Sequence, residues 1–326
     1  MKIAIIGCGQ IGSRHLQAIV KLKTNLKIQV VEPNERAQRI GKDRLEDVSF
    51  AKNKKRIEWL RDISQIEKTA DLTIVATTAK GRSEIIEKLL QTGHKRFLIE
   101  KMVCQSTREY KKLLESFDKN QAKGWVDCSR RYYPFYQKIL DLLKGKTPII
   151  FNVTAGNLGL GCNAIHFLDL FCAIIQEPQD IKLKGEYLFP ELLPNQRGKD
   201  LIEFAGTITA KADNNFASIT FHPESDAGII VNILSKNTRV FIDEGDRKAF
   251  LTTKQNNWQW KKHQFKFKEI YTSTLTTEIA ESIIKNDTCK LPTLQDSYYL
   301  HKELFQIFNQ HIKLITGKNP VLCPIT

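Results

Sequence analysis

The sequence predicts an α/β protein that combines an N-terminal doubly wound parallel sheet with a C-terminal α+β domain containing a mainly antiparallel sheet. Before about residue 122, short apolar runs alternate with segments of helical periodicity, which is typical of a parallel sheet covered by helices. Beyond it, apolar residues recur at every second position, which is typical of an antiparallel sheet with one covered face. The 326 residues exceed one ordinary core, so we expect two domains, at residues 1–122 and 123–326.

The expected N-terminal domain begins with a buried strand and then alternates helices and strands. The predicted strands are residues 2–6, 26–31, 71–78, 96–100 and 124–128, and the predicted helices are residues 13–21, 34–44, 82–91 and 106–120. Asn34 is a suitable N-cap for the second helix, and Gly93 is a suitable C-cap for the third. The charged stretch that ends near Lys68 is predicted to be irregular.

The expected C-terminal domain mixes helices with strands of period two. The predicted helices are residues 134–143, 164–175, 273–285 and 294–315, and the predicted strands are residues 147–153, 203–210, 217–221, 228–234, 239–243 and 249–253. The run Asp213-Asn214-Asn215 predicts a hairpin turn, and the alternation of Trp258 and Trp260 predicts a further strand on the open face of the sheet. Because an apolar open face is typical of an interface, we expect a homo-oligomer, either a dimer or a tetramer.

The composition is that of a globular protein and argues against several other classes. Apolar residues make up 41% of the chain, yet no run approaches the ~18 apolar residues of a membrane span. The net charge of +14 is spread along the chain without a nucleic-acid-binding motif, so we expect no nucleic acid as partner. The plain interpretation is a solvated lysine-rich surface, and the alternative is a surface that steers an anionic small substrate. The 7 cysteines are scattered and form no C-x-x-C pair, which indicates neither disulfides nor a metal site. With a strand beginning at Lys2, we expect no signal peptide and a cytoplasmic location.

The first predicted strand runs directly into Gly7-Cys8-Gly9-Gln10-Ile11-Gly12, which matches G-x-G-x-x-G. In this motif Gly7 allows a tight turn, Gly9 lets the backbone approach a pyrophosphate, and Gly12 lets the next helix pack closely. The unpaired N–H groups at the start of that helix favour phosphate. The alternative is an ordinary glycine-rich turn without a ligand, but the strand, the motif and the helix follow one another at the spacing that a dinucleotide site requires. We therefore expect a Rossmann dinucleotide site lined by Gly7, Gly9, Gln10, Ile11 and Gly12.

Glu32 ends the second predicted strand, about 20 residues beyond the motif, where such sites carry an acidic residue. Its carboxylate would accept hydrogen bonds from the adenosine ribose and would repel the 2′-phosphate of NADP. The sequence therefore favours NAD over NADP as the cofactor. Arg36 and Arg39 lie nearby in the sequence and work against this preference.

Further polar residues follow the later strands of the same sheet. Ala76, Thr77 and Thr78 end one strand, and Glu100 and Lys101 end the next. Ligands of open α/β sheets bind beyond the carboxyl ends of the strands. We therefore expect Ala76, Thr77 and Glu100 to contact the cofactor.

Three segments together resemble the Gfo/Idh/MocA oxidoreductases, the family of glucose–fructose oxidoreductase and inositol dehydrogenase. Glu100-Lys101-Met102 resembles the family's Glu-Lys-Pro, Ala76-Thr77-Thr78 resembles its Ala-Thr-Pro, and His166-Phe167-Leu168-Asp169 resembles its H-x-x-D segment. The stretch from Ser273 to the last helix is similar too, so the resemblance covers nearly the whole chain. It implies hydride transfer between NAD(P) and a CH–OH group, in a cleft between the two domains.

The resemblance implies catalytic roles for two side chains. Lys101 would hydrogen-bond the substrate hydroxyl, hold its carbon against the nicotinamide and lower the pKa of the hydroxyl; taken alone, it is an ordinary solvated lysine. His166 would accept the proton, because an imidazole titrates near physiological pH; the alternative is a core histidine on an apolar helix. Glu100 would place the ribose or the nicotinamide end of the cofactor.

Two positions depart from the family pattern. Members that oxidise sugars or inositol often carry an aspartate four residues before the histidine, where this chain has Cys162. A thiol does not replace a carboxylate as an orienting group. Met102 stands where proline is usual. Asn163 is a candidate to bind a sugar hydroxyl, and Arg131 is a candidate for an anionic or sugar group, or equally for packing at the hinge between domains.

We therefore predict an NAD-dependent dehydrogenase or reductase acting on a sugar, a polyol or a sugar nucleotide. Two other functions stay open. Loss of the aspartate at Cys162 favours a non-catalytic NAD-binding regulator or scaffold, whereas retention of Lys101 and His166 favours the enzyme. An enzyme that recycles NAD internally would turn over its substrate without net formation of NADH.

Overall fold

The computed structural model describes residues 1–49, 51–67, 69–176, 180–260, 265–267 and 271–326. The chain forms two compact units. Unit 1 consists of Met1–Cys104, Arg108–Ser129 and Ile270–Gln295, and unit 2 consists of Gln105–Thr107, Arg130–Glu269 and Asp296–Thr326. Each unit thus combines segments from before and after residue 122, the expected domain boundary.

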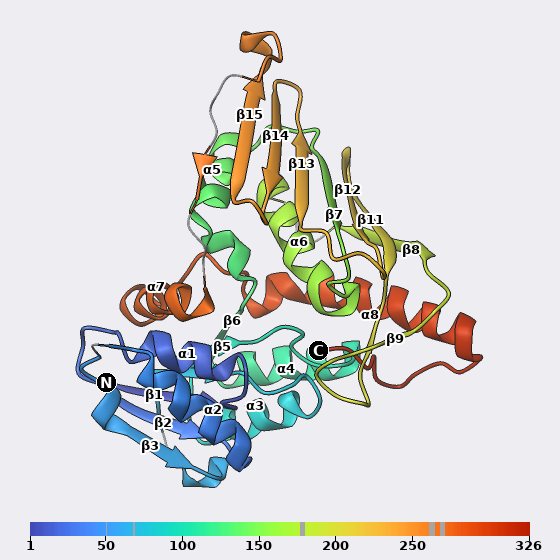
Figure 1. The fold of residues 1–326 in the computed structure, drawn as a ribbon. Helices are drawn as coiled ribbons and strands as arrows, with labels where there is room; N and C mark the ends of the chain where they lie inside the picture. The colour runs from blue at the N-terminus through green and yellow to red at the C-terminus, as the bar shows by residue number, and fades with distance from the viewer. Residues whose placement is uncertain (50, 68, 177–179, 261–264, 268–270) are drawn as a thin grey trace. The chain divides into compact units, whose positions relative to one another are not determined.

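Among the described residues, unit 1 contains a parallel six-stranded sheet in the order β3-β2-β1-β4-β5-β6 (Figure 1). Its strands are β1 (Lys2–Ile6), β2 (Lys27–Val31), β3 (Ile57–Leu60), β4 (Leu72–Val75), β5 (Arg96–Ile99) and β6 (Lys123–Val126). Its helices are α1 (Gly12–Ile19), α2 (Glu35–Glu46), α3 (Arg82–Gln91), α4 (Thr107–Lys119) and α7 (Thr272–Asn286). The strand order reverses between β1 and β4, the switch point where such sheets bind ligands. The predicted Rossmann sheet is confirmed.

Local sequence explains several element boundaries in unit 1. Asn34 caps α2 by accepting a hydrogen bond from the Ala37 backbone N–H (3.1 Å). After α3, Gly93 adopts a φ of +94°, a left-handed conformation suited to glycine. Strand β3 lies in the charged stretch that the sequence predicted to be irregular, so that prediction is wrong there. The strand is only four residues long and charged residues surround it, so its apolar residues Ile57, Trp59 and Leu60 are too few to reveal it against the charged stretch.

Unit 2 contains, within the described residues, an eight-stranded sheet in the order β16-β15-β14-β13-β7-β12-β11-β8. Its strands are β7 (Ile150–Ala155), β8 (Lys182–Leu188), β11 (Gly206–Ala212), β12 (Asn215–Phe221), β13 (Ile230–Leu234), β14 (Thr238–Asp243), β15 (Lys248–Thr253) and β16 (Phe265–Lys266). Only β7 and β12 pair in parallel, so the mainly antiparallel sheet is confirmed. The other elements are α5 (Pro134–Leu143), α6 (Leu160–Ile175), α8 (Leu294–Thr316) and a short ladder of β9 (Leu193–Pro194) with β10 (Ile202–Glu203).

Two predictions about this sheet have different outcomes. The hairpin between β11 and β12 turns at Asp213, whose φ is +49°, as the Asp-Asn-Asn run predicted. The strand predicted around Trp258 and Trp260 is wrong. After β15 the chain forms a 3₁₀ turn, Lys254–Asn256, and Trp258 then takes a φ of +58°, so period-two alternation there does not reflect an extended backbone.

Helix α6 packs against β11 and β12, and the residues of β12 alternate between buried and accessible. The accessible face of the sheet carries both hydroxyl groups and apolar side chains. The hydroxyls of Thr207 and Thr220 hydrogen-bond each other (2.9 Å), while Phe216 is 48% exposed. Among the described residues, no helix is both long and apolar enough to cross a lipid bilayer.

We expect this accessible face to pair with a second copy of the chain. Light scattering at micromolar concentration should then give the mass of a dimer or tetramer. Phe216→Glu, which places a charge on the exposed face, should shift the mass towards the monomer. A monomeric mass for the unmodified protein would contradict the prediction.

Candidate functional site

The glycine loop between β1 and α1 is tightly packed at its ends and open in its middle. Gly7 has a φ of +85°, and a Cβ there would lie 2.9 Å from the Thr77 nitrogen and 3.0 Å from the Ala76 backbone. A Cβ on Gly12 would lie 1.9 Å from the Gly7 carbonyl oxygen. In contrast, a Cβ on Gly9 would meet nothing within 4 Å. The loop therefore needs glycine at both ends and leaves space beside Gly9 that fits a pyrophosphate.

Glu32 ties the end of β2 to this loop. Its carboxylate accepts hydrogen bonds from the backbone N–H groups of Cys8 (2.7 Å) and Asn34 (3.0 Å). Each oxygen keeps a further lone pair, which suits a ribose hydroxyl. Burial, together with the charge of Glu32, raises the pKa of the Cys8 thiol to about 12, so Cys8 stays a neutral thiol.

Arg44 of α2 brings a guanidinium group to the same loop. It donates hydrogen bonds to the Ser13 hydroxyl (2.6 Å) and to the backbone and side-chain oxygens of Gln10. Arg36 and Arg39 are exposed. Sequence reasoning missed Arg44, because nothing in the pattern of a charged amphipathic helix distinguishes the arginine that reaches a loop from those that face solvent.

One buried arginine holds the loops that follow β4 and β5. Arg82, only 1% exposed, donates hydrogen bonds to the carbonyl oxygens of Thr77, Glu100 and Met102. A buried guanidinium is tolerated only when its donors are satisfied, and three carbonyl oxygens do this here. Arg82 thereby fixes the backbone on either side of Lys101, whose own side chain is buried.

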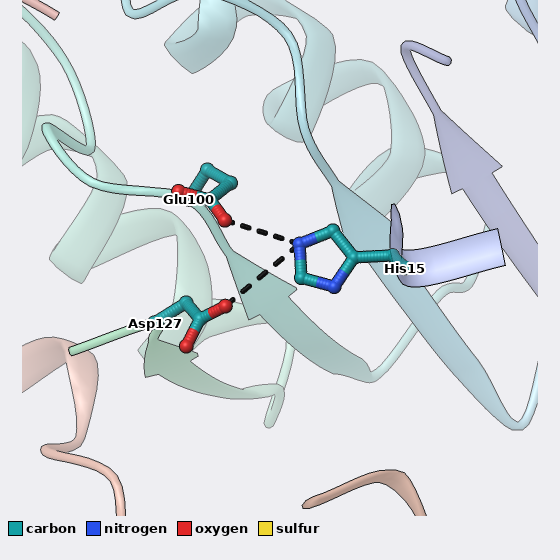
Figure 2. A group of neighbouring side chains, drawn as sticks. All are labelled: His15, Glu100 and Asp127. Carbon is teal, nitrogen blue, oxygen red and sulfur yellow. Dashed lines mark hydrogen bonds and ion pairs between the residues drawn. The ribbon is translucent and has the colours of Figure 1, made fainter. Parts of the chain in front are cut away.

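Three ionisable side chains, of which His15 and Asp127 are buried and Glu100 is partly exposed, form a cluster beside this loop that we call the His15 cluster (Figure 2). His15 comes from α1, Glu100 follows β5 and Asp127 follows β6. The Nε2 atom of His15 lies 3.1 Å from Glu100 Oε1 and 3.8 Å from Asp127 Oδ2. In the part of the chain that the structure describes, no other His, Cys, Asp and Glu side chains gather closely enough to hold a metal ion.

The hydrogen bonds of His15 define which ring nitrogen carries a proton. Thr276 of α7 donates its single hydroxyl hydrogen to the Thr272 carbonyl oxygen (2.9 Å). It must therefore accept in its 2.8 Å contact with His15 Nδ1, so Nδ1 is protonated. A bare lone pair on Nε2 would face the oxygen of Glu100. A proton must consequently lie between these two atoms, and the raised pKa of His15 together with the lowered pKa of Glu100 places it on the ring.

Burial and these contacts set the charges of the His15 cluster. Burial lowers the pKa of His15, but the hydrogen bond and charge of Glu100 more than offset this, so the pKa is raised overall. Burial raises the pKa of Glu100, but the hydrogen bond from His15 more than offsets this, so it is lowered overall. Burial and the neighbouring charge of Glu100 raise the pKa of Asp127 to about 7. Near neutral pH the cluster thus contains an imidazolium, a carboxylate and a carboxyl group that titrates.

This assignment predicts a pH-dependent stability difference. The pKa of Asp127 is about 7 in the folded protein and about 4 in an unfolded chain, so the folded state loses stability as pH rises between these values. Asp127→Asn does not titrate, and its stability should rise relative to the unmodified protein by up to ~1.4 kcal/mol per pH unit in this window. Urea unfolding at several pH values measures the difference. Asp118→Asn, which changes an exposed residue of α4, is the control and should show no such difference. If its stability also rose with pH relative to the unmodified protein, the assignment would be contradicted.

The other predicted site residues lie in unit 2, two of them on α6. His166 is half-buried there, and the amide of Asn163 donates hydrogen bonds to carbonyl oxygens of the preceding loop. Cys162 is buried, and its backbone N–H donates to the Glu203 carboxylate (3.3 Å). Glu203 thus caps the N-terminal turn of α6, which lacks a cap from its own N-cap residue.

Arg131 is engaged in a partly buried ion pair. It donates two hydrogen bonds, both 2.7 Å long, to the carboxylate of Asp169, the last residue of the H-x-x-D segment. Its neighbour Arg130 pairs with Glu244 (3.2 Å) and lies over the ring of Phe167 (4.1 Å). Substrate contact by Arg131 stays a prediction.

Unit 1 by itself brings together the glycine loop, Glu32 and the segments around Thr77 and Glu100. Lys101 belongs to unit 1 and His166 to unit 2, so their joint action stays a prediction. Sequence reasoning missed His15 and Asp127. A carboxylate directly after an apolar strand was the available signal for Asp127, the same signal that drew attention to Glu100.

Comparisons with known proteins agree with this geometry. Residues 1–128 match the family model Gfo/Idh/MocA, described as an oxidoreductase family with an NAD-binding Rossmann fold. A comparison with curated protein sequences gives no match.

Solved structures share the fold over nearly the whole chain. UDP-N-acetylglucosamine 3-dehydrogenase from Acidithiobacillus ferrooxidans is 14% identical, with a TM-score of 0.72 over 94% of this chain and 96% of that one. A Gfo/Idh/MocA family oxidoreductase from Vibrio cholerae is 14% identical, with a TM-score of 0.69 over 98% and 100%. A 3-ketoreductase from Actinomadura kijaniata in complex with NADP is 12% identical, with a TM-score of 0.68 over 93% and 95%. Residues 1–128 are therefore similar to the NAD-binding Rossmann domain of the Gfo/Idh/MocA oxidoreductases, and the whole chain shares the fold of these solved structures.

Proposed function

We propose that the protein transfers hydride between a nicotinamide cofactor and a carbinol or carbonyl carbon of a sugar, a polyol or a sugar nucleotide. The observation that carries the proposal is the placement of Lys101. It is held directly after β5, at the sheet edge that also bears the glycine loop, and it follows Glu100 of the His15 cluster. The dehydrogenase and the ketoreductase of similar fold support this substrate class. The net charge of +14 favours an anionic substrate such as a sugar nucleotide.

The chain's own residues would orient the substrate and move its proton. When bound, the cofactor supplies the site that gives or receives hydride. The Lys101 ammonium would hydrogen-bond the substrate oxygen and stabilise the negative charge that develops on it. His166 would accept the hydroxyl proton during oxidation and return it during reduction. Asn163 would bind a further hydroxyl of the substrate, and Arg131 would bind an anionic group.

We expect NAD to bind more tightly than NADP, because the fixed carboxylate of Glu32 repels a 2′-phosphate. Glu32→Gln removes the charge and keeps one acceptor oxygen, so it should narrow the preference by about tenfold, or ~1.4 kcal/mol. Calorimetric titration with both cofactors measures this. Glu35→Gln, an exposed residue of α2, is the matched control. Tighter binding of NADP than NAD by the unmodified protein would contradict the expectation.

Cys162 favours a second function, a non-catalytic NAD-binding regulator or scaffold. Its thiol occupies the position of the family's aspartate and is buried, so it supplies no carboxylate beside His166. Substrates carrying deuterium at the carbinol carbon separate the two functions. The enzyme moves deuterium to the cofactor, and a regulator binds NAD without moving it.

A further inference from the structure

Asp127 sits in the His15 cluster in a way that favours its protonated form. Its Oδ2 is directed at His15, whereas its Oδ1 is buried and has no hydrogen-bond partner among the described residues. An ionised carboxylate with an unsatisfied buried oxygen is costly, and a neutral carboxyl group is much less so. The imidazolium of His15 is already paired with Glu100 at 3.1 Å, so it does not fully compensate a second negative charge.

The charged groups around the His15 cluster act unequally on its two carboxylates. Lys101 follows Glu100 directly, and Arg82 of α3 donates to the Glu100 backbone carbonyl. The charges of both cations, together with His15, favour the ionised form of Glu100. The ionised form of Asp127 is favoured by the charge of His15 and by a hydrogen bond from Ser129, but burial and the charge of Glu100 disfavour it more strongly. The exchangeable proton of the cluster therefore resides on Asp127.

We propose that the His15 cluster is a proton store linked to the charge of the cofactor. Asp127 keeps its proton when the site is empty or holds the reduced cofactor, and it releases this proton to water when the oxidised cofactor binds. The oxidised nicotinamide ring is cationic and the reduced ring is neutral, so only the oxidised form stabilises an additional negative charge nearby. The inference rests on the proposed function and on the expectation that Glu100 places the ribose or the nicotinamide end of the cofactor.

The proton balance of this step is simple. Asp127 carboxyl plus free NAD⁺ gives Asp127 carboxylate with bound NAD⁺ and one H⁺ in water; no bond to the cofactor forms and no electrons move. The partly exposed carboxylate of Glu100 is the member of the cluster through which the proton reaches solvent. Asp127 acts through Glu100 and is therefore a positioning residue.

Calorimetry in buffers of different ionisation enthalpy tests the proposal, because it counts the protons exchanged on binding. At about pH 6, below the pKa of Asp127, binding of NAD⁺ should release about one proton, and binding of NADH should release none. The affinity for NAD⁺ should rise with pH by up to about tenfold per unit below this pKa. Asp127→Asn should abolish both effects, and Asp118→Asn should leave both unchanged.

Three results of the binding experiments would overturn the proposal. One is a proton release that persists in Asp127→Asn, and another is equal release with NAD⁺ and NADH. The third is tight binding of Zn²⁺ that Asp127→Asn abolishes, which would make a metal ion the cation between His15 and the carboxylates. Nitrogen NMR of His15 without cofactor should show both ring nitrogens protonated. A neutral His15 ring in this spectrum would overturn the assignment of charges in the cluster. Absence of NAD binding in the calorimeter would instead overturn the proposed function, so failure of the inference and failure of the proposed function are distinguishable.

Discussion

Replacing Gly9 with valine is expected to abolish NAD binding while the protein remains folded. A Cβ at this position meets nothing within 4 Å, so the added side chain does not clash with the loop itself. It would instead fill the space that the pyrophosphate needs. We expect affinity for NAD to fall by at least about 100-fold, or ~2.7 kcal/mol, and Gly9→Ala to give a smaller loss. Calorimetric titration measures the affinity, and thermal unfolding checks the fold.

A matched control for this change is Gly228→Val. Gly228 is exposed in unit 2, and a Cβ there would meet its nearest atom, in Gly245, only at 3.6 Å. It should leave both the affinity for NAD and the unfolding temperature unchanged. Unchanged affinity in Gly9→Val would show that the cofactor does not cross the glycine loop.

Lys101→Ala and His166→Ala are each expected to lower kcat by about 10²–10⁴-fold, which is the usual effect of removing a positioned acid–base group. The affinity for NAD should change little, because neither residue belongs to the glycine loop. Lys101→Arg should recover little of the loss, since a planar guanidinium does not replace a compact ammonium. Steady-state kinetics on the substrate that supports hydride transfer measures the effect.

Two further variants control for general effects of removing these residue types. Lys95→Ala removes an exposed lysine at the opposite end of β5, and His222→Ala removes an exposed histidine just after β12. Both should retain near full turnover. If His166→Ala also retains it, His166 is a core residue and another group accepts the proton. Full turnover in Lys101→Ala would contradict its proposed role.

The fold around the glycine loop was predictable because its signals are local. The turn at Gly7, the close packing at Gly12 and the acid at Glu32 lie in one continuous strand–loop–helix–strand segment, and each has a direct physical reason. The alternation of strands and helices indicates a parallel sheet, in which the carboxyl ends of all strands lie at the same edge. This is why Thr77 and Glu100 could be assigned to the sheet edge before the fold was known.

The His15 cluster was not predictable in the same way. Its members come from α1 and from the residues that follow β5 and β6, and they meet because the sheet has the order β3-β2-β1-β4-β5-β6. A threonine of α7, which lies far away in the sequence, hydrogen-bonds His15. Arg82 was missed for a related reason. At the start of an amphipathic helix an arginine is usually solvated, and its burial follows from three carbonyl oxygens contributed by two loops.

Strand predictions failed where the alternation of apolar residues in the sequence does not correspond to an extended backbone. Strand β3 is only four residues long and lies within a charged stretch, yet it pairs along the edge of an established sheet. Trp258 shows the reverse case, in which apolar alternation falls on a turn. Both outcomes depend on partners distant in the sequence, which a local window does not contain.

The most direct test of the central claim is transfer of deuterium from a labelled carbinol to the cofactor. The unmodified protein, supplied with NAD and a panel of deuterated sugars, polyols and sugar nucleotides, should label the nicotinamide with at least one of them. Lys101→Ala should not do so. Because the label is read on the cofactor and on recovered substrate, internal recycling without net NADH is detected as well. Binding of NAD without deuterium transfer in either direction across the panel would contradict the account.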